Sequence, residues 1–198
     1  YPDLGVLTAN EIHVPVSKST ALTLESKDVI HSFWVPELGG KMDLIPGHVN
    51  QMWMRPTQVG QYHGQCAEFC GTSHANMRFE VIAQTQDQFN AWIASQKLPA
   101  AAPTTDLAKQ GAQIIQTAGC QACHSINGVA AMVGKVGPNL THVASRQQIA
   151  SGLLDFNADN VRLWIGNPPA VKPGSVMPKL PLTPDQLDAL VAYITSLK

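Results

Sequence analysis

The chain has 198 residues and a net charge of −1, with 44% hydrophobic and 14% charged residues. This apolar content is enough for one large or two small cores, and no apolar run reaches the about 18 residues of a membrane span. Residues 1–95 carry a net −4 and residues 96–198 a net +3. No basic block indicates nucleic acid, and the opposite charges favour docking of the two halves.

The first half has the pattern of a β-domain. Short runs of alternating apolar residues predict strands, and glycines and prolines between them predict turns. The runs are residues 10–16, 20–26, 29–35, 49–55 and 77–84. Strands this closely spaced favour a sandwich or barrel. A capping box at residues 85–88 begins a helix that we expect to end a first domain of residues 1–95.

The second half has helical spacing. Residues 96–105 contain two prolines and several small residues, which predict a semi-rigid linker of at most about 35 Å. Apolar faces beyond it predict helices near residues 107–118, 157–165 and 183–197. For the last helix we expect Thr183 as N-cap, Pro184 in the first turn and Gln186 completing the capping box. Residues 106–198 therefore predict a small all-α domain.

The segment Cys120-Gln-Ala-Cys123-His124 has the pattern of c-type haem attachment. Its thiols would bond the haem vinyl groups, and its histidine would ligate the iron. A thioredoxin-like dithiol or half of a zinc site needs an α/β context or a second ligand pair, which the sequence lacks. Met177 is the candidate sixth ligand and His142 the alternative. His/Met ligation favours electron transfer.

Other residues of this half have less specific roles. We expect Met132 to pack or lie in a loop, and Gly137-Pro138-Asn139-Leu140 to pack on the proximal haem face. Arg146 and Trp164 either serve the haem propionates or are ordinary surface and core residues. The attachment motif, the Gly-Pro-x-Leu segment and the Met177-Pro178 loop follow the order of class I cytochromes c. Residues 106–198 resemble that family, which implies a cytochrome c fold.

One loop of the first half concentrates soft metal ligands. Cys66, Cys70, His74 and Met77 lie within twelve residues, and thiolate, imidazole and thioether together favour copper. A mononuclear blue-copper site uses one cysteine and two histidines. The extra thiolate indicates two metals with bridging sulfurs and a second histidine from elsewhere. The alternatives are a Cys66–Cys70 disulfide or a zinc site that also uses His31.

The loop resembles the CuA signature of cytochrome c oxidase subunit II. The matching motif is Cys66-x-Glu68-x-Cys70-x-x-x-His74-x-x-Met77, and an earlier segment, Asp28-Val-Ile-His31-Ser-Phe-Trp34, is also similar to that family. The resemblance covers about residues 1–95 and implies a cupredoxin-like Greek-key sandwich or barrel.

The same resemblance implies a role for each ligand. Two cysteines, Cys66 and Cys70, would bridge two coppers, and His31 and His74 would bind one copper each. The remaining weak ligands would be Met77 and the backbone carbonyl of Glu68. In this family the carboxylate at the position of Glu68 also faces a magnesium or manganese ion at the contact with subunit I. Because the thiols and imidazoles must lose protons to bind, we expect metal loading to fall at low pH.

Together the two halves resemble subunit II of caa3-type oxidases. The resemblance implies a relay from a donor, such as a cytochrome c, a high-potential iron–sulfur protein or a bc-type complex, through haem and CuA to subunit I. There oxygen is reduced and protons are pumped, so the fragment itself would transfer electrons only. The family's membrane hairpin would precede Tyr1. We therefore expect a soluble fragment on the periplasmic face of a bacterial plasma membrane, partnered by subunit I and other integral membrane subunits.

Three other functions fit parts of the pattern. Nitrous oxide reductase also carries CuA, but its copper cluster needs more histidines than the four left over here. A CuA-containing nitric oxide reductase subunit and a free-standing two-centre electron carrier are the alternatives. Among the unassigned histidines, we expect His13, His48 and His63 to lie at the surface or in hydrogen bonds.

Overall fold

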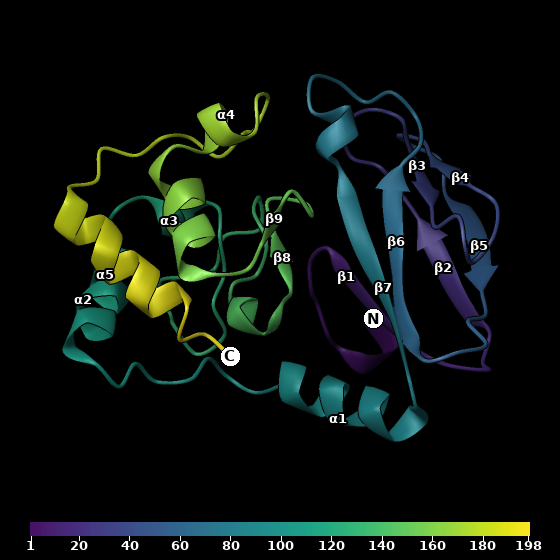
Figure 1. The fold of residues 1–198 in the computed structure, drawn as a ribbon, viewed down its shortest axis with the longest axis horizontal. Coiled ribbons are helices and arrows are strands. Elements are labelled where there is room, and N and C mark those ends of the chain that lie inside the picture. Colours follow the sequence, from purple (N-terminus) through teal and green to yellow (C-terminus); the bar gives the residue numbers. More distant parts are fainter. The chain divides into compact units, whose positions relative to one another are not determined.

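The computed structural model describes residues 1–198, which divide into two compact units. One unit consists of Asn10–Ser95 with Ser151–Leu153. The other consists of Tyr1–Ala9, Gln96–Ala150 and Leu154–Lys198. The first is rich in strands and the second is mainly helical (Figure 1). None of the helices is long and apolar enough to cross a membrane.

The strand-rich unit has two sheets. The larger sheet has the order β1-β7-β6-β3-β4, and the smaller one pairs β2 with β5. In chain order the elements are β1 (Glu11–Pro15), β2 (Thr20–Leu24), β3 (His31–Trp34), β4 (Met42–Leu44), β5 (Asn50–Met54), β6 (Gly60–Cys66), β7 (Arg78–Gln84) and helix α1 (Gln86–Gln96). The first and last strands, β1 and β7, run parallel, and the other pairs are antiparallel. The expectation of an all-β sandwich is confirmed.

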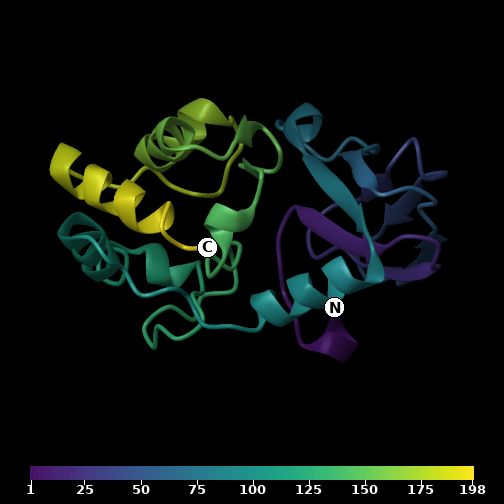
Figure 2. The same ribbon diagram turned by 60° about the horizontal axis from the view of Figure 1, so that its bottom comes forward.

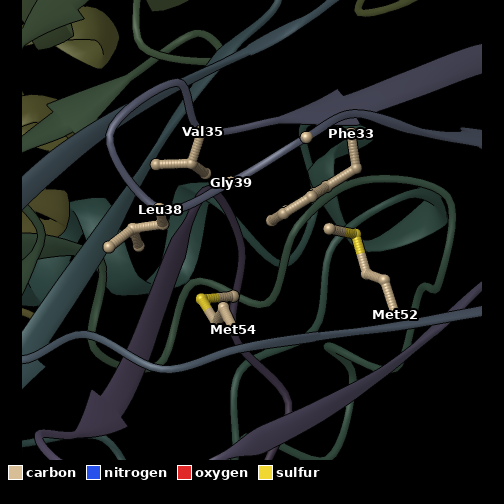
Figure 3. A pocket seen from close by; sticks show the side chains of 7 residues that line it. Phe33, Val35, Leu38, Gly39, Met52 and Met54 are labelled. Carbon is tan, nitrogen blue, oxygen red and sulfur yellow. The ribbon is translucent and has the colours of Figure 1, made fainter.

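The core of this unit lies between the two sheets. Val14, Val81 and Ala83 from β1 and β7 meet Met54 from β5 and Val35 just beyond β3. A small apolar hollow continues this core (Figure 3), lined by Phe33, Val35, Leu38, Gly39, Gly40, Met52 and Met54. Its lining carries no ionisable or metal-binding group apart from the two thioethers. The hollow is therefore an extension of the core and not the functional site.

The helical unit is built around the contact of its first and last long helices. Its elements are α2 (Asp106–Ile114), β8 (Gln148–Ile149), β9 (Leu154–Asp155), α3 (Ala158–Gly166), α4 (Pro168–Val171) and α5 (Pro184–Ile194). Both views show α2 beside α5 (Figures 1 and 2). Gly111 makes the close approach possible, because a Cβ there would overlap the carbonyl of Ala189. The core below this contact includes Ile115, Leu190 and Tyr193.

The predicted helix starts are confirmed. Thr183 accepts a hydrogen bond from the backbone of Gln186, whose side chain bonds back to Thr183, so the capping box is complete. The same reciprocal pair joins Thr85 and Gln88 before α1. Asn157 caps α3. Each of these side chains satisfies a backbone N–H group that the first helical turn leaves without a partner.

The sequence did not predict strands β4 and β6, the hairpin β8–β9 or the short helix α4. Strand β6, the central strand of the larger sheet, reads Gly-Gln-Tyr-His-Gly-Gln-Cys and was not predicted. Its inward positions are small or amphipathic, so the alternation of apolar residues is weak. The helical unit also contains the two-residue hairpin β8–β9, which is too short to give a period-2 signal. The β-sheet class of the strand-rich unit and the helical class of the other unit are as predicted.

Candidate metal centres

The soft ligands of the first unit come from two neighbouring strands and one loop. His31 begins β3, and Cys66 ends β6, the antiparallel neighbour of β3. The loop after β6 carries Cys70, and His74 begins a short 3₁₀ turn, His74–Asn76. The loop closes on itself because the backbone N–H of Cys66 donates to the carbonyl of Met77 at 2.9 Å. All five predicted side-chain ligands therefore lie at one end of the sheet.

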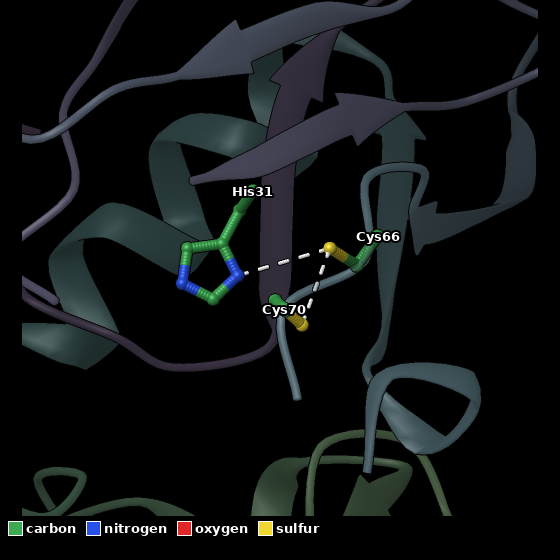
Figure 4. Close-up of side chains that lie close together, drawn as sticks. All are labelled: His31, Cys66 and Cys70. Atoms are coloured by element: carbon green, nitrogen blue, oxygen red, sulfur yellow. Dashed lines mark hydrogen bonds between the residues drawn. The ribbon is translucent and has the colours of Figure 1, made fainter. Parts of the chain in front are cut away.

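These donor atoms form a chain of near-equal steps. Nδ1 of His31 lies 3.8 Å from Sγ of Cys66, which lies 3.7 Å from Sγ of Cys70 (Figure 4). Sγ of Cys70 lies 3.6 Å from Nδ1 of His74 and 3.7 Å from Sδ of Met77. The order is imidazole, thiol, thiol, imidazole. Both thiols are free, and no disulfide joins them.

The spacing fits two metals better than one. Two ligands that bind one metal tetrahedrally at about 2.0–2.3 Å lie about 3.3–3.8 Å apart, which matches every step of the chain. His31, Cys66 and Cys70 form a group whose ligand atoms all lie within 4.8 Å of one another, and His74 is outside it. A single four-coordinate zinc would need all four together. The residues present thus fit a binuclear copper centre with shared thiolates.

A backbone carbonyl completes the donor set. The carbonyl oxygen of Glu68 lies 3.3 Å from Sγ of Cys66, and the Glu68 side chain is exposed. This carbonyl and the Met77 thioether are neutral groups that each lie beside one of the two thiols. Phe69, between the cysteines, is 75% exposed, and its ring meets the imidazole of His74 edge-on at 5.8 Å.

The two thiols of the metal-free site have opposite tendencies to ionise. Burial opposes ionisation of Cys66, but hydrogen bonds with the backbone of Glu68 and Ser32, and with the imidazoles of His31 and His74, outweigh it and lower the pKa. Burial raises the pKa of Cys70, and the neighbouring sulfur of Cys66 raises it further. Without metal, one of the two cysteines keeps its proton, because two adjacent thiolates repel each other.

His31 has a carboxylate partner whose role the sequence does not indicate. Its Nε2 lies 2.9 Å from Oδ1 of Asp28. Burial favours the neutral imidazole, but the hydrogen bonds with Asp28 and Cys66 outweigh burial and raise the pKa of His31. The same bond is the largest cause that lowers the pKa of Asp28 to about 2. An acid three residues before a histidine is too common a spacing to identify from sequence.

The haem-attachment motif of the second unit forms a tight turn. Cys120–Ala122 is a 3₁₀ turn that follows Gly119, whose φ of 97° suits glycine. The backbone N–H of His124 donates to the carbonyl of Cys120 at 2.9 Å. Both thiols, Cys120 and Cys123, are free. The turn thus presents two thiols and an imidazole from five consecutive residues.

The His124 ring is oriented from its far side. Its Nδ1 lies 2.8 Å from the carbonyl oxygen of Pro138, so Nδ1 donates and Nε2 keeps the lone pair for a metal. Gly137 packs against the same ring, where an added Cβ would come within 2.7 Å of Nδ1. Burial lowers the pKa of His124 and outweighs the hydrogen bond to Pro138, which raises it; the Arg146 charge adds to the lowering, so the neutral ring is favoured. A neutral, oriented imidazole beside two thiols fits covalent haem.

The candidates for the sixth iron ligand have different surroundings. Met177 is half-buried in the loop between α4 and α5, where its backbone N–H donates to Oγ of Ser175 at 3.2 Å. The Nε2 atom of buried His142 lies 3.1 Å from the carbonyl oxygen of Leu98, so this nitrogen is engaged elsewhere. Met132 is 1% exposed and belongs to the core, as expected.

Other singled-out residues have structural partners. Nη2 of Arg146 donates to the carbonyl of Asn139 at 2.6 Å, and Trp164 is half-buried on α3. His13 is buried against the ring of Trp92 at 3.9 Å between centroids. The remaining two histidines differ, since Nδ1 of His63 bonds to Glu80 at 2.8 Å and His48 is exposed.

Family comparisons agree with these two sites. Residues 4–84 match the family described as cytochrome C oxidase subunit II, periplasmic domain. Residues 108–198 match the cytochrome c family. The first match contains the cysteine–histidine loop, and the second contains the haem-attachment turn. The fold and the sites therefore define a cupredoxin-like electron-transfer domain with a candidate copper site, joined to a cytochrome c domain.

Relatives carry both domains in the same order along the whole chain. A protein named cytochrome c oxidase subunit 2 from Alkalihalophilus pseudofirmus is 39% identical over all of this chain and 57% of its own length. One of the same name from Bacillus subtilis is 34% identical over all of this chain and 58% of its own. The chain thus spans rather more than half the length of these relatives. It joins a domain that matches the periplasmic domain of cytochrome c oxidase subunit II to a domain that matches cytochrome c, and over its whole length it is similar to proteins named cytochrome c oxidase subunit 2.

A solved structure is also similar over the first unit. The periplasmic domain of subunit II of cytochrome oxidase from Bradyrhizobium japonicum is 34% identical, with a TM-score of 0.46. The match covers 49% of this chain and 82% of that one.

Proposed function

We propose that this chain relays electrons from a donor to oxidase subunit I, through a haem bound at Cys120, Cys123 and His124 and a binuclear CuA centre. The observation that carries the proposal is the chain of donors His31–Cys66–Cys70–His74 at steps of 3.6–3.8 Å. Cys66 and Cys70 would supply thiolates to both coppers, and the bound centre would spread one unpaired electron over the two metals.

The surrounding residues favour electron transfer by holding their ligands still. Cys66 is fixed in a strand and by the carbonyl of Met77, and His31 by its strand and by Asp28. In the other unit Pro138 fixes the ring of His124. Ligands that are already held in position move little when the charge of the metal changes, so electron transfer needs little reorganisation.

The finer assignments follow from the same proposal. Met177 is the sixth ligand of the iron, and Met77 and the carbonyl of Glu68 are the weak copper ligands. The Glu68 carboxylate reaches a magnesium or manganese ion at the subunit I contact. The functional domains are residues 1–95 and 106–198, joined by the linker 96–105.

The whole protein is, on this proposal, subunit II of a caa3-type oxidase. The chain lies on the extracytoplasmic face of a bacterial plasma membrane and is anchored by a hairpin outside this sequence. Its donor is a cytochrome c, a high-potential iron–sulfur protein or a bc-type complex. Oxygen is reduced in subunit I, not in this chain.

Intramolecular electron transfer tests the relay. The chain loaded with haem and copper is mixed with less than one equivalent of reductant, and the absorption of both centres is followed. We expect haem and copper to equilibrate at a rate independent of protein concentration, and the Cys66→Ser variant to lose the copper phase. A rate that scales with protein concentration would contradict an intramolecular relay.

A further inference from the structure

The imidazole of His31 makes contacts through both of its nitrogens. Nδ1 points to the sulfur of Cys66, and Nε2 points away from the cysteines (Figure 4). On that far side Oδ1 of Asp28 lies 2.9 Å from Nε2. A carboxylate accepts and cannot donate when ionised, so Nε2 carries the ring proton. This tautomer leaves the Nδ1 lone pair free on the side of the thiols.

Asp28 is itself held in place. The backbone N–H of Val29 donates to the same Oδ1 atom at 2.9 Å, and Oγ of Ser26 lies 3.0 Å from it. The carboxylate is therefore fixed by a closed local network between β2 and β3, although the Asp28 side chain is 74% exposed. Because one oxygen of Asp28 has three partners, its carboxylate is held in the position that contacts His31 although the side chain is exposed.

The second candidate copper histidine lacks such a partner. The imidazole of His74 contacts Sγ of Cys70 through Nδ1 and the ring of Phe69 at its edge. No carboxylate lies within ion-pair distance of it, in contrast to His31, His13 and His63. The two ends of the donor chain are thus chemically different.

We infer that Asp28 is a positioning residue of the copper centre, which fixes the tautomer and ring orientation of His31 and makes it the more basic of the two copper imidazoles. A carboxylate behind a metal-bound histidine has both effects in general. The consequence is an inequivalent pair of coppers, with the His31 end receiving more electron density. This inference rests on the binuclear copper site proposed above.

The test compares Asp28→Ala and Asp28→Asn with Glu25→Gln. Glu25 is exposed and lies three residues before Asp28, and the hydrogen-bond partners of His31 are Asp28 and Cys66 instead. The Glu25→Gln variant therefore changes the charge by the same amount without removing a partner of the ring. We expect Asp28→Ala to weaken copper binding on the order of 10–100-fold. Asp28→Asn, which keeps an acceptor oxygen, should retain most of the affinity, and Glu25→Gln should match the wild type.

A second readout needs no metal. Nitrogen chemical shifts of the ¹⁵N-labelled metal-free protein report the tautomer of each histidine ring. We expect His31 to be protonated at Nε2 in the wild type and in Asp28→Asn, and to be a mixture in Asp28→Ala.

The outcomes separate the two claims. A wild type that binds no copper overturns the copper site and this inference together. A wild type with two coppers, whose Asp28→Ala variant binds copper equally well and keeps the His31 tautomer, overturns this inference alone. An equal loss in Asp28→Ala and Glu25→Gln would mean that charge and not the hydrogen bond is responsible, which also overturns it.

Discussion

The sulfur atoms of Cys66 and Cys70 lie 3.7 Å apart and unbonded, each with its own histidine on the outer side. Two metals with shared thiolates require this arrangement, in which a pair of sulfurs lies between two imidazoles. It predicts that neither cysteine is dispensable, because each thiolate would serve both metals.

Replacing either cysteine by serine should abolish the binuclear site. A hydroxyl is a poorer and harder ligand than a thiolate, so Cys66→Ser and Cys70→Ser should each lose the hyperfine pattern of a shared electron and at least one copper. His63→Ala, in the same unit but bonded to Glu80, is the matched control. Metal analysis and electron-spin spectra make the measurement. Two bound coppers in Cys66→Ser would show that the bridging role is wrong.

Gly137 should be essential to the haem ligand. A Cβ there would come within 2.7 Å of Nδ1 and 3.0 Å of Nε2 of His124, so Gly137→Ala should push the ring from the Pro138 carbonyl. We expect a loss of about 1–3 kcal/mol in the free energy of unfolding, measured by urea titration, and an altered haem spectrum. The control is Val136→Ala at the neighbouring position, which is 75% exposed. Equal stability of both variants would contradict the tight contact.

Tyr193 should make the helical unit sensitive to alkali. The residue is 2% exposed, and burial raises its pKa. Below about pH 10 the phenol is neutral in both states and has no effect. Above it the unfolded chain ionises first, so the unfolded state binds fewer protons and stability falls as pH rises.

The variant Tyr193→Phe should remove this alkaline loss. It keeps the buried ring without the ionisable group, so urea midpoints above pH 10 should fall less steeply than in the wild type. Tyr62→Phe, in the other unit, is the control. Parallel pH profiles for the wild type and Tyr193→Phe would mean that the phenol is not the group responsible.

His142 should hold the linker against the helical unit. Its Nε2 donates to the carbonyl of Leu98 at 3.1 Å, and the N–H of Ala100 bonds to Asn127 at 3.0 Å. Losing one of the two attachments should free the chain near Lys97, so we expect His142→Ala to be cut there by trypsin several-fold faster. His48→Ala, at an exposed position, is the control. Unchanged cleavage would show that the hydrogen bond contributes little.

The chemistry of this protein was easier to predict from sequence than its geometry. Most candidate ligands of both sites, though not His31 or Met177, stand in short motifs whose residue types are rare, so Cys66 to Met77 and Cys120 to His124 could be singled out directly. The helix starts at Thr85 and Thr183 were also predictable, because capping depends on local spacing.

What the sequence did not reveal depends on tertiary contacts. Strand β6 has a polar face, and its inward residues are small apart from the amphipathic Tyr62, so only its pairing with β3 and β7 defines it. The roles of Asp28 and Gly137 each require knowing which ring lies beside them. His142 is a plausible iron ligand by type, and only its contact with Leu98 reveals another partner.

Metal analysis combined with electron-spin spectra of the purified chain is the decisive measurement for the binuclear copper centre. We expect two coppers and one covalently bound haem per chain, with hyperfine splitting from one electron that couples to both coppers. A single zinc, a single copper with its own splitting, or a Cys66–Cys70 disulfide without metal would contradict it.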